Sequence, residues 1–124
     1  MKLNLDCVRD IMLAVEEAPL NQIITLKYLS EKTKHNADDV YYSCMKLSET
    51  GYLKIKTVIF SGHAQPQIAD INELTYRGHN SLDSIRSNSV WDKVKETIKA
   101  RGLASSIEVI GEIAIALAKG KLGL

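Results

Sequence analysis

The hydrophobic positions of the first fifty residues follow a helical period. Between Asp6 and Glu17, apolar side chains spaced three and four apart lie on one face, which predicts a first helix. A β-branched segment, 23–25, suits a brief edge strand, and a two-turn helix is predicted from Leu26 to Thr33. A third helix is predicted over residues 37–50, with a buried stripe formed by Val40, Cys44 and Leu47.

Local signals mark the ends of this third helix. Asn36 is a good N-cap, and Asp39, three residues later, can serve the free backbone amides of the first turn. Gly51 provides a C-terminal stop.

After Gly51 the hydrophobic period changes from helical to alternating, which predicts a strand over residues 53–60. A turn-forming segment, 61–66, and a returning strand from Ile68 to about Asn72 complete a predicted hairpin.

The rest of the chain is predicted to be helical. Thr75 caps a helix that ends before residues 87–89, and another helix runs from about Val90 to Arg101 with Trp91 as a core anchor. The last helix begins near Ser105 or Ser106. This order predicts an α+β, mainly helical chain: a winged helix-turn-helix domain over residues 1–86 and a C-terminal helical extension over residues 87–124.

Length and composition fit one core in an ordinary globular protein of 124 residues, 45% hydrophobic and 25% charged. No apolar run reaches the roughly 18 residues that a membrane span needs. Charged residues at 6, 9 and 10 interrupt the region where a signal peptide would be apolar, so a cytoplasmic protein without membrane association is expected. Cys7 and Cys44 each fall on an apolar stripe, which favours buried free thiols over a disulfide or a metal pair.

Charge is balanced along the chain. The formal net charge is +1, with eight Lys or Arg against eight Asp or Glu in residues 1–60, and eight against seven in residues 61–124. A dedicated nucleic-acid binder usually has a clustered positive field, so any DNA contact here depends on local patches. Asp38 and Asp39 would repel a phosphate backbone at the start of the third helix, although aspartate can accept from a cytosine amino group.

Catalytic and metal-binding motifs are missing from the sequence. His35, His63 and His79 have no metal-ligand spacing with one another or with the cysteines. No phosphate loop, nucleophile elbow or paired-carboxylate arrangement is present, and the two acidic residues at 38–39 have a structural reason as first-turn charges. An enzyme, a metal site and a cofactor are therefore not expected.

Four segments of the chain, taken together, are similar to a known family. The opening 1–10, the segment 74–86 with its Leu-Thr-x-x-Gly turn, the Val90-Trp91 pair and the closing 119–124 together resemble an uncharacterised family from bacteria and their phages. This resemblance covers essentially the whole chain and implies a winged-helix domain of unknown function. It supplies no catalytic or binding residues.

The favoured function is DNA binding by a phage or prophage-type transcriptional regulator. In this reading the third helix enters a major groove while lysines neutralise phosphates of double-stranded DNA. The candidate DNA-binding residues are Lys32, Lys34, Tyr41, Tyr42, Ser43, Lys46, Lys54 and Lys56. The alternative for the lysines is ordinary solvated surface, because each has an acidic residue nearby in sequence.

A homodimer built on the last helix is also expected. Apolar residues cover most of its circumference, so one face would pack on the domain and the other on a partner chain. The candidate interface residues are Ile107, Ile110, Ile113, Ala114 and Leu117. Full burial inside the monomer is the alternative.

The rival function is a protein-interaction module, such as a phage-encoded adapter of a host protein, in which exposed tyrosines form the interface. A third reading, a purely structural dimer, has the same sequence features as this second one.

Overall fold

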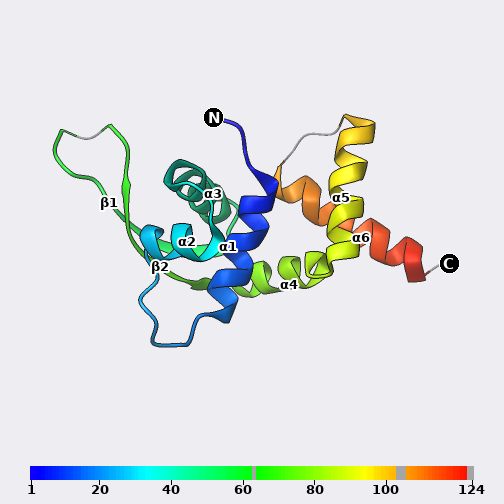
Figure 1. Ribbon diagram of the computed structural model, residues 1–124, viewed down its shortest axis with the longest axis horizontal. Coiled ribbons are helices and arrows are strands. Elements are labelled where there is room, and N and C mark those ends of the chain that lie inside the picture. The colour runs from blue at the N-terminus through cyan, green and yellow to red at the C-terminus, as the bar shows by residue number, and fades with distance from the viewer. Residues whose placement is uncertain (63, 103–105, 123–124) are drawn as a thin grey trace.

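A computed structural model describes residues 1–62, 64–102 and 106–122. The elements are α1 (Leu5–Glu17), α2 (Leu26–Thr33), α3 (Ala37–Glu49), β1 (Leu53–Val58), β2 (Gln67–Leu74), α4 (Tyr76–Ile85), α5 (Asn88–Arg101) and α6 (Ile107–Leu122). The described chain thus has six helices and one antiparallel hairpin, which confirms an α+β, mainly helical fold (Figure 1). Within these ranges, no helix is long and apolar enough to cross a membrane.

The first three helices pack on one another around a shared core. Each begins at a side-chain cap: Asn4 accepts from the Cys7 amide, Thr25 from the Tyr28 amide and Asn36 from the Asp39 amide. Their apolar stripes are fully buried at the contact, including Ile11, Leu29, Val40, Cys44 and Leu47. The Asn36 cap and the apolar stripes are features that the sequence pattern predicts, and the caps at Asn4 and Thr25 are found only in the structure.

The hairpin differs from the alternating pattern, because β1 is shorter than predicted, β2 is longer, and their pairing is less regular. β1 ends at Val58, so Ile59 and Phe60 lie beyond the strand and are exposed. The pairing shifts by one residue at two points on β2, which leaves Ala69 and Asn72 as the extra residues of two bulges. The predicted edge strand at 23–25 is reduced to one bridge, in which the Ile71 amide donates to the Ile24 carbonyl at 3.2 Å.

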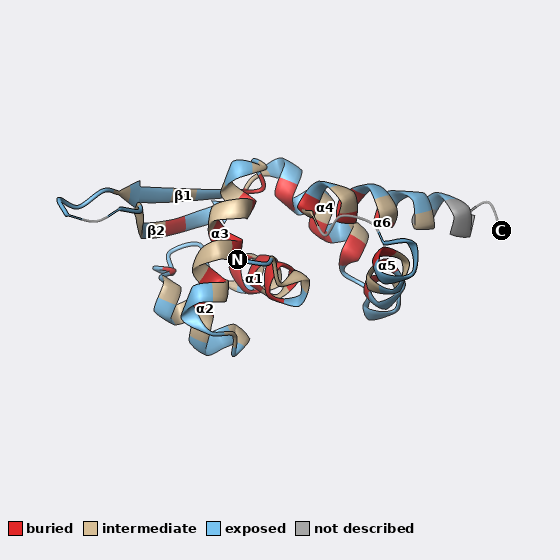
Figure 2. Ribbon diagram, turned by 90° about the horizontal axis from the view of Figure 1, so that it is seen from above, coloured by how far each residue is buried: buried red, intermediate tan, exposed pale blue. Residues whose placement is uncertain are grey.

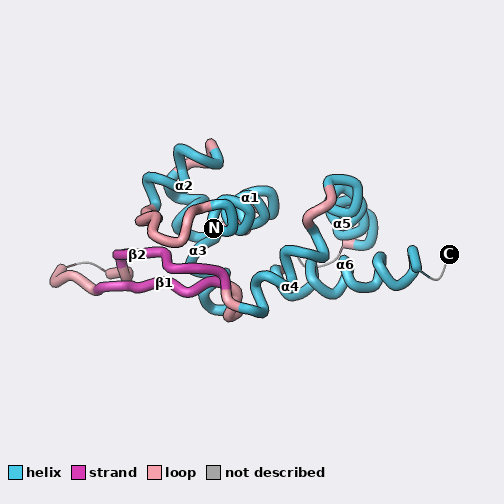
Figure 3. Tube along the Cα trace, turned by 90° about the horizontal axis from the view of Figure 1, so that it is seen from below, coloured by secondary structure: helices cyan, strands magenta, loops and turns pink. Residues whose placement is uncertain are grey.

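Figures 2 and 3 show two groups of elements, with α1–α3 and the hairpin on one side and α4, α5 and α6 on the other. α4 follows β2 directly, and Thr75 caps it by accepting from the Gly78 amide at 3.0 Å. Gly78 lies against the backbone carbonyl of Tyr52, where a Cβ atom would collide. Glycine at this position therefore allows α4 to approach the start of the hairpin.

The boundaries of the last two helices differ slightly from the prediction. α5 begins at Asn88, two residues earlier than expected, because Ser87 already takes the extended N-cap conformation. α6 begins at Ile107, with the Ser106 hydroxyl accepting from the Val109 amide at 3.2 Å. The alternative start at residue 105 lies outside the described residues.

A row of polar side chains on α1 joins the two groups. We call Asp6, Arg9 and Glu16, with their partners on α4 and α5, the α1 seam. Arg9 is only 8% exposed; its Nε donates to the Ile85 carbonyl at 2.9 Å and its Nη2 to the Arg86 carbonyl at 2.6 Å. The guanidinium therefore meets the negative end of the α4 dipole.

At each end of the α1 seam, a carboxylate of α1 accepts further hydrogen bonds. Asp6 accepts from Trp91 Nε1 at 2.8 Å and from Lys95 Nζ at 2.9 Å, so the prediction that Trp91 is a buried anchor is confirmed. Burial raises the pKa of Asp6, but these hydrogen bonds outweigh it and the pKa is lowered. The Glu16 carboxylate accepts hydrogen bonds from Nη1 of Arg86 at 2.6 Å and from Nη2 at 2.7 Å.

Candidate functional site

The start of α3 is shaped by capping. Asn36 Oδ1 accepts from the Asp39 amide at 2.8 Å, while Asn36 Nδ2 donates to Asp39 Oδ2 at 3.1 Å. Asn36 is therefore confirmed as the N-cap of α3, whereas the Asp39 carboxylate accepts from the Asn36 side-chain amide and not, as predicted, from a free backbone amide. Asp38 is exposed beside it. One of the two carboxylates at the start of α3 is thus engaged locally, by the Asn36 side chain.

Ser43 was predicted to be an exposed DNA contact, and this prediction is wrong. The residue is 1% exposed, because spacings of three and four from Val40 and Leu47 place it on the core stripe. Its hydroxyl has no hydrogen-bond partner. Burial raises the pKa of the nearby Cys7 thiol, and the Ser43 hydroxyl lowers it by a smaller amount. The two groups do not have the geometry of a hydrogen bond.

The two tyrosines of α3 are half-buried rather than freely exposed. The Tyr41 hydroxyl donates to the Pro66 carbonyl at 2.6 Å, which ties α3 to the hairpin. The Tyr42 ring lies under the Lys46 ammonium, 5.3 Å from the ring centroid. Both side chains therefore have partners within the chain. We call α3 and the hairpin, joined by the Tyr41 bond, the α3–hairpin surface.

Two of the candidate lysines are already paired with carboxylates. Lys46 Nζ lies 3.1 Å from Glu49 Oε2, and this hydrogen bond raises the lysine pKa. Lys54 Nζ lies 3.7 Å from Glu73 Oε1 across the hairpin. Glu73 and Glu49 thus neutralise part of the positive charge predicted for this region.

The other three candidate lysines, Lys32, Lys34 and Lys56, are exposed. Within the part of the chain that the structure describes, none of them has a carboxylate within 4.0 Å. Lys34 takes the left-handed conformation at the end of α2 (φ 63°), and Lys56 projects from β1. These side chains remain available to bind an anionic partner.

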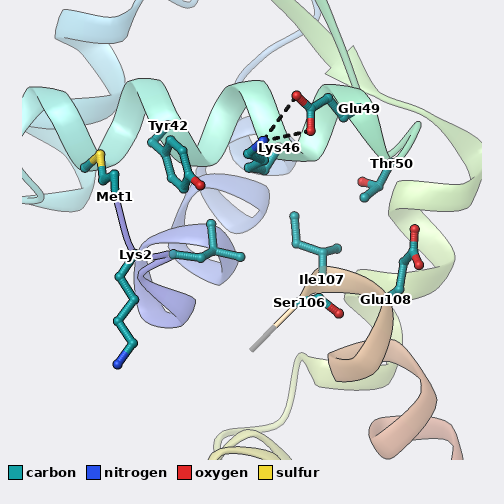
Figure 4. A pocket seen from close by; sticks show the side chains of 10 residues that line it. Met1, Lys2, Tyr42, Lys46, Glu49, Thr50, Ser106, Ile107 and Glu108 are labelled. Carbon is teal, nitrogen blue, oxygen red and sulfur yellow. Dashed lines mark hydrogen bonds and ion pairs between the residues drawn. The ribbon is translucent and has the colours of Figure 1, made fainter. Parts of the chain in front are cut away.

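A cavity of about 690 Å³ lies between the second half of α3, the N-terminal segment and the start of α6. Figure 4 shows Lys46 and Glu49 paired on α3, Tyr42 beside them, and Ile107 and Ser106 facing them from α6. Lysine and carboxylate side chains occur together on its wall, so the cavity has no dominant charge. Its volume lies in the range of small-molecule sites.

The predicted dimer residues on α6 are covered mostly by the chain itself. Ile107, Ile110 and Ala114 are buried as α6 packs on α4 and α5, and Ile113 and Leu117 are half-buried against the same core. The first three are therefore not available to a partner chain while α6 is packed in this way. Among the α6 side chains whose burial the structure describes, Ile115 is the large apolar one that stays exposed, at 51%.

Outside this cavity, both cysteines are buried and two of the histidines lie beside carboxylates. Cys7 and Cys44 are free and buried, as predicted, and burial raises their thiol pKa values to about 11 and about 12. His35 pairs with Asp10 at 2.8 Å, and His79 lies 3.6 Å from Glu16. His63 lies outside the described residues. Among the described residues, no three His, Cys, Asp or Glu side chains gather as metal ligands would.

Comparison with known proteins identifies relatives but no solved fold. The chain is 31% identical over 115 residues to a protein of Haemophilus influenzae named "Uncharacterized protein", with 92% of each chain covered. No solved structure matches. Residues 2–104 match the model of a family described as "Hypothetical protein (DUF2513)". The chain therefore belongs to the DUF2513 family.

Proposed function

We propose that the chain is a winged helix-turn-helix protein that binds double-stranded DNA, with α3 as the recognition helix and the hairpin as the wing. The order α1, α2, α3, β1, β2 is that of a winged helix. The observation that carries the proposal is the bond from Tyr41 to the Pro66 carbonyl, because it makes α3 and the hairpin one surface. Exposed lysines without carboxylate partners accompany that surface.

In this mechanism α3 enters a major groove, and Lys34 and Lys56 bind phosphates on either side. Phosphate contacts position the protein, while side chains on the outward face of α3 meet base edges. Asp38, at the exposed start of α3, can accept from a cytosine amino group. A protein of this kind fits a phage or prophage-type transcriptional regulator.

The test is a salt series of DNA binding with a matched pair of variants. Lys34→Gln with Lys56→Gln removes two candidate phosphate contacts, whereas Lys93→Gln with Lys99→Gln removes two exposed charges from α5. The first pair should lower the slope of log affinity against log salt by about 0.9 per contact. The second pair should leave the slope unchanged. Equal slopes for both pairs, or no binding by the wild type at low salt, would reject the proposal.

A homodimer remains part of the proposal, now based on the outward face of α6. Two copies would present two α3 helices to two half-sites. Ile115 is the exposed apolar residue available there, next to the exposed Glu112. Light scattering of the wild type and of Ile115→Lys tests this. If the wild type has the mass of a dimer and Ile115→Lys has the same mass, this face is excluded as the interface.

Protein binding without DNA is the second candidate, as for a phage-encoded adapter of a host protein. The loop between α1 and α2 favours it, since Leu20 is 96% and Ile23 is 71% exposed beside a cavity of about 540 Å³. This candidate is supported over the first if the wild type binds no DNA but captures a protein partner. The double variant Leu20→Ser with Ile23→Ser should then lose that partner.

A further inference from the structure

A smaller cavity, of about 350 Å³, lies between α4 and α6. The two helices pack on each other and lie side by side in Figures 2 and 3. Each helix lines the cavity with one face, made of residues spaced three and four apart. Tyr52, the residue before β1, also lines it. The volume is at the lower end of the range for small-molecule sites.

The Tyr52 hydroxyl is a polar group without a partner in this cavity. Tyr52 is only 5% exposed, and the Arg77 guanidinium covers its ring, 5.2 Å from the ring centroid. Among the described residues, none makes a hydrogen bond with the Tyr52 hydroxyl. A Cβ atom added at Gly111, on the α6 wall, would lie 3.7 Å from this oxygen, so the hydroxyl points toward that wall. It therefore takes its hydrogen bond from whatever fills the cavity, water or a ligand.

Opposite charges line the two walls of the cavity. Arg77 is exposed on α4, and Glu108 and Glu112 are exposed on α6. Within the part of the chain that the structure describes, none of the three has an oppositely charged group within 4.0 Å. The arginine and the two glutamates therefore share a cavity without neutralising one another.

A small molecule with one anionic and one cationic group matches this arrangement. Its carboxylate would meet the Arg77 guanidinium, and its ammonium would meet Glu108 and Glu112. A simple anion would face both glutamates, and a simple cation would face the arginine. The larger cavity beside α3 does not offer the same match, because its Lys46 is already paired with Glu49.

We propose that the cavity between α4 and α6 binds a free α-amino acid. Its carboxylate binds Arg77, its ammonium binds Glu108 and Glu112, and one of its polar atoms completes the hydrogen bonding of the Tyr52 hydroxyl. This inference goes beyond the proposed function and does not depend on DNA binding. A ligand in this position contacts α4, α6 and the residue before β1, so it ties the C-terminal helix to the rest of the chain.

Thermal unfolding of the full chain with each common L-amino acid in turn is the first measurement. A ligand that binds the folded state raises the Tm, and at least one amino acid should do so. For that amino acid, calorimetric titration should give an affinity lower by about tenfold or more for Arg77→Met and by severalfold for Tyr52→Phe. Arg101→Met and Tyr28→Phe, outside the cavity, should keep the wild-type affinity.

Gly111→Ala separates loss of binding from loss of folding. The added methyl group would lie 3.7 Å from the Tyr52 oxygen and 3.8 Å from Ser81 Oγ, which are ordinary contact distances. It occupies the space through which a ligand reaches the hydroxyl, while alanine is the better helix former. This variant should therefore have a higher Tm than wild type without ligand and should lose the response to the amino acid.

Ligand analogues test the two charges separately. The amide of the same amino acid lacks the carboxylate, and the corresponding carboxylic acid without the amino group lacks the ammonium, so both should bind wild type more weakly. Arg77→Met should no longer distinguish the amino acid from its amide. Glu108→Gln with Glu112→Gln should no longer distinguish the amino acid from the analogue without the amino group.

Three results would overturn the inference, and none of them bears on DNA binding. The first is a wild-type Tm that no amino acid raises. The second is wild-type affinity in both Gly111→Ala and Arg77→Met, because the ligand would then bind outside this cavity. The third is an analogue with one charge that binds wild type as tightly as the amino acid does, because the site would then not recognise a zwitterion.

Discussion

The α1 seam pairs its charged side chains within the chain, whereas the α3–hairpin surface and the turn before α3 pair only some of theirs. Lys46 and Lys54 meet carboxylates there. Along the seam, Asp6, Arg9 and Glu16 each meet partners from α4 or α5 at hydrogen-bonding distance. On the α3–hairpin side, Lys34 and Lys56 have no carboxylate within 4.0 Å among the described residues. Inside α3, the Ser43 hydroxyl is buried without an acceptor.

This difference separates residues that hold the fold from residues that are available for function. A paired, buried charge such as Arg9 is expensive to remove, because its partners stay buried without it. An exposed lysine contributes little to stability, so its role must be found in what it binds. The comparison therefore predicts that stability and binding respond to different sets of substitutions.

Arg9→Met should have the largest effect on stability. It leaves the carbonyls of Ile85 and Arg86 without their donor in a nearly closed site, at a cost of about 3 kcal/mol in the free energy of unfolding. Urea unfolding measures it. Arg77→Met, at an exposed arginine stacked 5.2 Å from the Tyr52 ring centroid, should cost only about 0.5 kcal/mol. Similar losses for both variants would contradict the importance of the seam.

Ser43→Ala should stabilise the protein. The substitution removes a buried hydroxyl without a partner and improves helix propensity, so a gain of about 1 kcal/mol is expected. Ser30→Ala is the matched control in α2, where the hydroxyl donates to the His35 carbonyl at 2.6 Å and its removal should destabilise. Thermal or urea unfolding of both variants tests the sign; a loss at Ser43 would mean that its hydroxyl has a partner.

Glu16→Gln should lower stability modestly, and more at neutral than at acidic pH. The hydrogen bonds from Arg86 lower the pKa of Glu16, against burial, below its ordinary value of 4.5. The ionised carboxylate therefore stabilises the fold above pH 4.5, and this contribution disappears as the pH falls through the lower folded pKa. A loss of about 1 kcal/mol at pH 7 should shrink as the pH falls below 4.5.

The control for this pH effect is Glu17→Gln. Glu17 is exposed and has no ion pair within the described residues, so its substitution should have little effect at either pH. Urea midpoints at pH 7 and pH 3 give the comparison. A Glu16→Gln loss that is as large at pH 3 as at pH 7 would point to packing rather than charge as the cause.

Lys34→Gln with Lys56→Gln should have the smallest effect on stability, within about 0.5 kcal/mol of wild type. Both side chains are exposed and make no ion pair in the described structure. The same variant is the one expected to weaken DNA binding. A large loss of stability would show that these lysines belong with the seam residues, and the distinction between the two regions would fail.

Local signals allowed much of the fold to be predicted. The caps at Asn36 and Thr75 depend on residues three positions away, and the structure has both. The alternating pattern predicted the hairpin but extended its first strand to Phe60, because the pattern does not register where pairing ends or where bulges shift it.

The details that need tertiary structure were missed. Arg9 finds its acceptors 76 and 77 residues away, and they are backbone carbonyls with no sequence signature. The available hint of burial was its helical spacing, because Leu5 lies four residues before it and Met12 three residues after it. Ser43 shows the same limit, although its spacing from Val40 and Leu47 places it on the core stripe and could have been read from the sequence.

The bond between Tyr41 and Pro66 has a consequence for how the family can vary. The donor is a side chain, but the acceptor is a backbone carbonyl, which every residue type supplies. Position 41 therefore needs a long side chain ending in a donor, whereas position 66 and the tip before it can change identity without breaking the link. Relatives can exchange one hairpin tip for another while α3 keeps its place, and the surface offered to a partner can diversify on a constant scaffold.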